Sequence, residues 1–140
     1  MKETRNSRME ELEGYFIETF VKKEKRERLR HELSHPNKRY AGLDRFCHQA
    51  EAFLDQRKIH LQGNDLERQM EFVSFVGKHK GQCLILAADV YPDGQTMELE
   101  EALSFAIKWT EAVIIIHHGF AIVFGEAMKG GRDKYLLLES

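Results

Sequence analysis

The stretch from Gln82 to Glu126 decides the fold, because it holds most of the uninterrupted apolar sequence: QCLILAADVYPDGQTMELEEALSFAIKWTEAVIIIHHGFAIVFGE. Residues 83–88 are apolar without alternation, which predicts a strand at the centre of a sheet with both faces covered. After the PDG turn, Thr96 and Glu98 are residues typical of a helix start. The order strand, helix, strand therefore predicts a βαβ unit with a right-handed crossover.

The end of this stretch predicts a hairpin. AVIIIHHGFAIVFG reads as two strands joined by a two-residue turn at His118 and Gly119, both of which accept a positive φ. The glycine-rich residues 125–132 predict an exposed loop, and Tyr135 to Leu138 predict a final strand. We expect a mixed sheet of about four strands, with a short extended piece near Ile59 in the connector 58–65.

Upstream of this core the sequence predicts a helical hairpin. Apolar residues recur at three- and four-residue steps from about Ser7 to Val21, and a charged extension over residues 22–30 is expected to continue the same helix to Leu33 or Ser34. Pro36 predicts a corner at SHPN, because proline cannot continue the helix. A second helix is predicted from about Asn37 to Arg57.

One more helix is expected between the hairpin and the core. Asn64 followed by Glu67 resembles a capping box, and Gly77 predicts the end of the helix. The predicted fold class is α+β, in a single domain over residues 1–140, with the helical hairpin at 1–57 packed on an α/β core at 64–140. If the helices cannot cover both sheet faces, a homodimer interface is expected to do so.

Composition narrows the functional classes. Charged residues make up 31% of the chain, yet the formal net charge is -2, so a polybasic membrane or histone-like protein is not indicated. The start of the sequence lacks the apolar core of a signal peptide, and the apolar runs are strand-sized. Cys47 and Cys83 fit buried thiols of a reducing compartment. We therefore expect a cytoplasmic protein without membrane contact.

Two metal motifs fail on their context. His31, Glu32 and His35 spell HExxH, but Pro36 breaks the helix that must hold both histidines on one face. The loop from Asp89 matches an EF-hand at four positions, Asp89, Asp93, Gly94 and Glu100, but it lacks two oxygen ligands. We expect no metal, no cofactor and no catalytic residue from these patterns.

An enzyme is not favoured, although it stays open. Cys47 and His48 are neighbours on one predicted helix, about 100° apart, so their side chains do not converge as a catalytic pair. An unrecognised active site would need a pocket formed near His48, His60 and Asp89.

The segment 22–48, which we call the basic corner, is the candidate partner-binding surface. Its expected contact residues are Lys22, Lys23, Arg26, Arg28, Arg30, Lys38, Arg39, Arg45 and His48. They could meet an acidic protein partner or the phosphates of a nucleic acid, but interleaved acidic residues dilute the field and no aromatic stacking motif accompanies them. The first hypothesis is a small binding or regulatory protein of the immunity or antitoxin kind, and nucleic-acid binding is the alternative.

Three segments, KKEKRERLRHELSHPNKRYAGLDRFCH at 22–48, DGQTMELEEAL at 93–103 and VIIIHHGFAIVFGE at 113–126, resemble an uncharacterised family of small bacterial cytoplasmic proteins. The resemblance implies a basic segment leading to a Ser-His-Pro or Ser-Asn-Pro corner, a helix with a histidine near the place of His48, and a strand that precedes an Asp-Gly turn and a helix. It implies no activity. The family's hairpin tends to carry Pro-Gly where this chain has His118 and Gly119, and its corner often lacks the first histidine of HELSH. Shared roles for His118 and His31 are therefore not implied.

Overall fold

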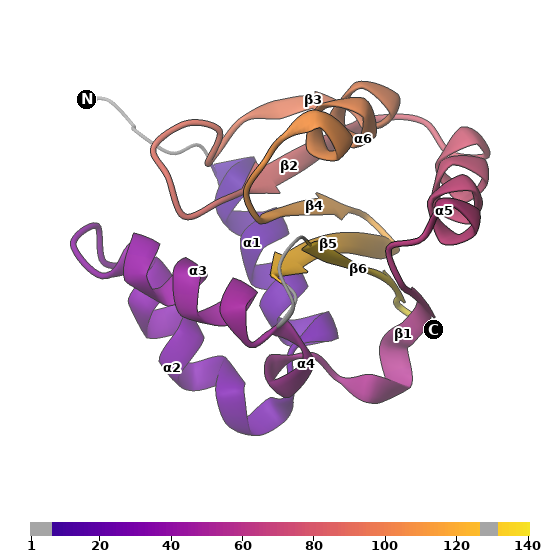
Figure 1. Cartoon of the computed structure of the whole chain (residues 1–140). Coiled ribbons are helices and arrows are strands. Elements are labelled where there is room, and N and C mark those ends of the chain that lie inside the picture. The colour runs from indigo at the N-terminus through magenta and orange to yellow at the C-terminus, as the bar shows by residue number, and fades with distance from the viewer. Residues whose placement is uncertain (1–6, 127–131) are drawn as a thin grey trace.

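The computed structural model describes residues 7–126 and 132–140, which form two layers of helices around one antiparallel sheet (Figure 1). The helices are α1 (Ser7–Phe20), α2 (Lys23–Leu33), α3 (Arg39–His48), α4 (Ala50–Phe53), the short 3₁₀ helix η1 (Gln56–Lys58), α5 (Leu66–Gly77) and α6 (Leu99–Lys108). The strands are β1 (Ile59–Gln62), β2 (Gln82–Leu86), β3 (Thr96–Glu98), β4 (Val113–His117), β5 (Phe120–Glu126) and β6 (Arg132–Leu138). The predicted α+β class is confirmed.

The sheet has six strands in the order β1-β6-β5-β4-β2-β3, rather than about four. Successive side chains along a strand point to opposite faces of the sheet, and successive residues of the central strands are apolar, so both faces are apolar. On β2, Leu84 and Leu86 face the helices α1 to α4, whereas Cys83 and Ile85 face α5 and α6. Figure 1 shows these two sets of helices on opposite sides of the sheet. The chain's own helices therefore cover both faces, as the unalternating strand sequences required.

The predicted parallel crossover is wrong. β2 pairs with β4 in the antiparallel sense, with Leu84 opposite Ile116 and Leu86 opposite Ile114. The reason is β3, which the sequence pattern assigned to a helix start. Residues Thr96–Glu98 pair back along β2, which adds one reversal of chain direction before α6 begins. After α6 the chain re-enters the sheet beside Leu86, so β4 runs opposite to β2.

The predicted hairpin is confirmed: β4 and β5 pair through a turn at His118 and Gly119. The turn uses a positive φ at Gly119, of 97°, and none at His118. The extended piece near Ile59 is confirmed as β1, and the end of α5 at Gly77 is also confirmed. Of the expected loop at 125–132, residues 125, 126 and 132 belong to strands, and 127–131 lie outside the described residues.

Each of the two long N-terminal helices is interrupted. The first breaks at Val21, which forms a bridge with Leu54, and the backbone N–H of Lys22 donates to the Phe53 carbonyl at 2.8 Å. The second breaks at Gln49 and ends at Leu54, which is extended. The hairpin is therefore a layer of four helices, because segments far apart in sequence pair with each other. The cap of α5 also differs by one residue, since Asp65 rather than Asn64 accepts from the Arg68 N–H.

Candidate functional site

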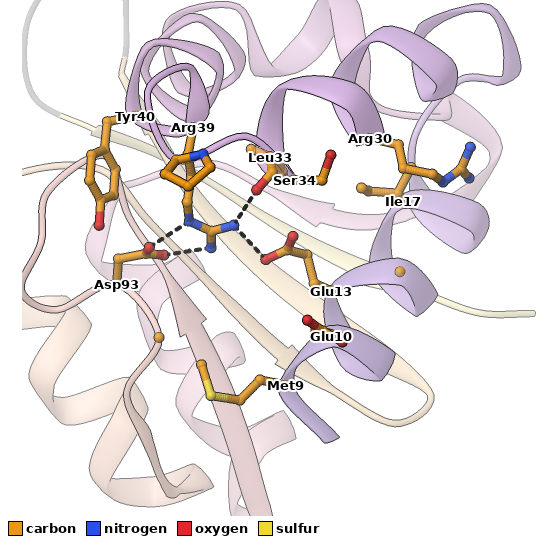
Figure 2. Close-up of a pocket in the computed structure, with 13 residues that line it drawn as sticks. Met9, Glu10, Glu13, Ile17, Arg30, Leu33, Ser34, Arg39, Tyr40 and Asp93 are labelled. Atoms are coloured by element: carbon orange, nitrogen blue, oxygen red, sulfur yellow. Dashed lines mark hydrogen bonds and ion pairs between the residues drawn. The ribbon is translucent and has the colours of Figure 1, made fainter. Parts of the chain in front are cut away.

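A cleft lies where α1 meets the turn between α2 and α3, and we call it the corner cleft (Figure 2). Its volume is about 820 Å³, which lies within the range of small-ligand sites. The lining residues come from α1, from the end of α2 and its turn into α3, and from the turn between β2 and β3. They are Met9, Glu10, Glu13, Gly14, Ile17, Arg30, Leu33, Ser34, Pro36, Arg39, Tyr40, Asp93 and Gly94.

The local sequence explains how α1 and the α2–α3 turn come to line the cleft. On α1, Met9, Glu13 and Ile17 are spaced by four residues and Glu10 and Gly14 follow them, so all five lie on one side of the helix. Pro36 cannot continue α2, and the chain turns over residues 34–38 before α3 begins at Arg39.

An ion-pair network forms the floor of the cleft. The Arg39 guanidinium donates to both Asp93 carboxylate oxygens, from Nε at 2.7 Å and from a terminal nitrogen at 3.0 Å. Its other terminal nitrogen pairs with Glu13 Oε1 at 2.9 Å and donates to the Leu33 carbonyl at 3.0 Å. The three side chains are only 5 to 11% exposed. The network therefore ties α1, the end of α2, α3 and the β2–β3 turn together.

Electrostatics keep this floor charged. Burial lowers the pKa of Arg39, but the hydrogen bonds and charges of Asp93 and Glu13 outweigh it, so its pKa lies above the ordinary value. Asp93 also accepts the Ala87 N–H at 3.1 Å, which fixes the carboxylate in place. Because Arg39 directs its donors at Asp93, Glu13 and Leu33, it has little capacity left for an anionic ligand.

Most of the basic corner is engaged within the chain. Arg39 is buried in the cleft floor instead of lying on a basic surface. Arg28 and Arg45 both pair with Glu32, which joins α2 to α3. Arg30 pairs with Glu18 of α1.

The remaining basic residues are spread out. Arg26 donates from Nε to the Val21 carbonyl at 2.9 Å. Lys22, Lys23 and Lys38 form no ion pair with any residue in the described part of the chain. Lys22 and Lys23 sit at the start of α2 and Lys38 lies beyond its end, about 16 Å away along an 11-residue helix. The role of these residues in binding a partner stays a prediction.

Residues of the two rejected metal motifs, HExxH and the loop that resembles an EF-hand, form other contacts within the chain. Glu32 of the HExxH sequence is held by Arg28 and Arg45, which lowers its pKa, chiefly through the Arg45 hydrogen bond. His35 lies past the end of α2, where its Nδ1 is 2.7 Å from the His31 carbonyl. In the loop that resembles an EF-hand, Asp93 is engaged by Arg39.

Cys47 and the candidate enzyme residues lie away from the cleft. Cys47 is buried, and desolvation raises the pKa of its thiol to about 12, which disfavours the reactive thiolate form. His48, His60 and Asp89 do not line the corner cleft. His48 instead contacts Asp44 and Glu126 at the exposed end of α3.

Sequence reasoning missed Glu13, Asp93 and the cleft itself. Glu13 carries a signal that could have been found, because it is a charged residue midway between Met9 and Ile17 on the side of α1 that faces the protein. Asp93 carried no comparable signal, since an aspartate before a glycine is ordinary turn chemistry.

No protein-family model, no curated protein and no solved structure matches this chain. None of the helices in the described ranges, 7–126 and 132–140, is long and apolar enough to cross a membrane. The family resemblance noted from the sequence stays a prediction.

Proposed function

We propose that this protein is a small binding module whose ligand site is the corner cleft, and that the ligand is a small amphipathic molecule carrying a protonated amine. The observation that supports this is the cleft's composition: apolar walls above a buried network with more carboxylates than guanidinium groups. The binding function expected from the sequence is kept, together with the cytoplasmic location, but the site moves from the outer basic surface into the cleft.

The walls favour an apolar body. Met9, Pro36 and Tyr40 are only partly buried or exposed and present apolar surface to the cleft, and the Tyr40 ring lies above Asp93 in Figure 2. Burying such surface contributes about 25 cal/mol per Å². An aromatic or branched aliphatic ligand of modest size therefore gains most of its affinity from these contacts.

The charges favour a cation. The described lining residues hold three carboxylates, of Glu10, Glu13 and Asp93, against the guanidinium groups of Arg30 and Arg39. Arg30 is paired with Glu18 outside the lining set. Two carboxylates and one guanidinium in the floor leave a formal charge of -1 where water is scarce, and Glu10 adds an exposed carboxylate. An amine near Glu10 offsets this charge, whereas an anionic ligand increases it.

The test compares two probes of similar shape and opposite charge, phenethylamine and 3-phenylpropionate, by saturation-transfer NMR and by thermal shift. We expect the amine to bind and the acid to bind at least several-fold more weakly. Equal signals from both probes, or a stronger signal from the acid, would contradict the proposed ligand class.

Matched variants locate the site. Gly14 lines the cleft, and a Cβ there meets no other atom within 4 Å. Gly14→Leu should place an isobutyl group inside the cleft and weaken amine binding strongly, whereas Gly14→Ala should leave it nearly intact. Glu10→Gln should weaken binding several-fold, and Glu100→Gln on the exposed surface of α6 should not. Unchanged binding in Gly14→Leu, with a helical circular dichroism spectrum, would place the ligand elsewhere.

An acidic protein partner at the start of α2 is the second candidate. Lys22 and Lys23 support it, because neither forms an ion pair with the described residues. The double variant Lys22→Glu, Lys23→Glu should lose such a partner in a pulldown, while Lys108→Glu on α6 should retain it. A partner that binds both variants equally would contradict a contact at Lys22 and Lys23. Binding to nucleic acid with an affinity that falls steeply with salt would favour the nucleic-acid hypothesis instead.

A further inference from the structure

His48, at the end of α3, lies between the carboxylates of Asp44 and Glu126. Asp44 is on the same helix, whereas Glu126 is distant in the sequence. His48 is the last residue of α3, and Asp44 is one turn earlier on the same helix. Glu126 is the last residue of β5. All three side chains are exposed, by 52, 62 and 42% in that order. This His48 cluster shares no residue with the corner cleft.

Backbone packing holds the two elements together. A Cβ added to Gly125 would lie 3.2 Å from both the Ala50 Cβ and the Cys47 carbonyl oxygen, which is closer than side chains normally approach. Because residue 125 is glycine, the end of β5 approaches the end of α3 directly. Glu126 is therefore brought opposite His48 by the fold and not by a long flexible side chain alone.

The imidazole is oriented as in protein metal sites. Nδ1 lies 3.0 Å from the Asp44 carbonyl oxygen, which suits an Nδ1–H donor and leaves Nε2 to accept a metal. Histidine ligands commonly donate their second N–H to a backbone carbonyl or carboxylate in this way, which fixes the tautomer. Nε2 points at Glu126 Oε1, 3.0 Å away.

The separations fit a shared ion. Two ligand atoms that each lie about 2.1 Å from one metal are about 3.0 to 3.4 Å apart for octahedral to tetrahedral angles. The Nε2 to Oε1 distance of 3.0 Å falls in that range. One ligand atom from each of Asp44, His48 and Glu126 lies within 4.8 Å of the others. Asp44 Oδ1 lies 3.6 Å from Nδ1, so the exposed Asp44 side chain must turn towards Nε2 to complete the set.

We propose that Asp44, His48 and Glu126 form a binding site for a divalent transition-metal ion of the zinc class. One imidazole and two carboxylates are ligands that suit Zn²⁺, Co²⁺ and Mn²⁺ better than Ca²⁺, which prefers oxygen alone. Because the cluster is exposed, water takes the remaining coordination positions. The ion would link α3 to β5, in place of the metal-free surface expected from the sequence.

The rival explanation is a simple ion pair between His48 and Glu126. Titration with Zn²⁺ against a chromophoric chelator, followed by Co²⁺ absorption spectroscopy, distinguishes the two. We expect one equivalent of Zn²⁺ to bind and to raise the melting temperature. His48→Gln, Asp44→Asn and Glu126→Gln should each weaken binding by about tenfold or more, as loss of a ligand or its support does.

Two controls address other exposed histidines. His60→Gln on β1 should leave the titration unchanged. The double variant His31→Gln, His35→Gln removes the adjacent pair whose ring centroids are 4.2 Å apart, and it should also retain binding. Absence of stoichiometric Zn²⁺ binding, unchanged binding in His48→Gln, or its loss in the His31, His35 variant would each overturn the proposal. None of these outcomes depends on the ligand of the corner cleft.

Discussion

Replacing Arg39 with methionine keeps an unbranched, largely aliphatic chain at this position. It removes the guanidinium that pairs with Asp93 and Glu13 and donates to the Leu33 carbonyl. The Asp93 and Glu13 side chains are 5 and 11% exposed, so both carboxylates lose the charge of Arg39 in a poorly solvated place. Removing one partner of a buried ion pair costs about 3 to 5 kcal/mol. We expect Arg39→Met to lose stability in that range, a large share of the about 5 to 15 kcal/mol typical of a domain.

The assay is urea unfolding at neutral pH, followed by far-ultraviolet circular dichroism. Arg68 provides the control, because it also pairs with a carboxylate, that of Glu71, but the two side chains are 42 and 44% exposed. Arg68→Met should therefore cost only a small fraction of the loss in Arg39→Met.

Neutralising the two carboxylates that face Arg39 supplies the second arm. If the penalty comes from buried charge, adding Asp93→Asn and Glu13→Gln to Arg39→Met should recover a substantial part of the stability. A loss of about 1 kcal/mol or less in Arg39→Met, the value of an exposed pair, would refute the reasoning. So would a triple variant less stable than Arg39→Met, since the cost would then lie in lost packing or hydrogen bonds.

Three further outcomes follow from local geometry. Gly125→Ala should destabilise the protein by about 1 to 3 kcal/mol in the same urea assay, because the new methyl lies 3.2 Å from the Ala50 Cβ and the Cys47 carbonyl oxygen and requires one of them to shift. Cys47 and Cys83, whose pKa values burial raises to about 12, should not react with a thiol reagent at pH 8 until the protein is unfolded; fast labelling of the native protein would contradict this. The pKa of Glu32 is lowered from its ordinary value of 4.5, mainly by the hydrogen bond from Arg45. The ionised Glu32 therefore stabilises the folded protein above pH 4.5, and this stabilisation is lost as the pH falls through the lower pKa of the folded state. Arg45→Gln should move the Glu32 titration in an NMR experiment up towards its ordinary value.

Much of the fold could be predicted because local pattern and burial agree. The unalternating apolar run at 83–86 indicated cover on both faces, and the structure places helices on each. The turn at His118 and Gly119 was readable from its length and from glycine's tolerance of a positive φ. Pro36 and Gly77 marked where α2 and α5 end.

The candidate sites were far less accessible from sequence. Charged residues at 22–48 indicated an exposed basic surface, because arginine is almost always at least partly exposed. Arg39 departs from this rule only because Asp93, 54 residues away, and Glu13 meet it in space. The His48 cluster likewise needs Glu126 from the opposite end of the chain.

The sequence by itself determined the α+β class, the strand residues that face inward and the corner at Pro36, since these depend on short-range periodicity and backbone preference. Only the tertiary structure decided three things: the break in the first helix at Val21, the direction of β4, and the burial of Arg39. Each of them depends on a pairing between distant segments: Val21 with Leu54, β3 with β2, and Arg39 with Asp93. Periodicity shows that a residue faces a partner, but it does not identify that partner, and the corner cleft is formed by such contacts.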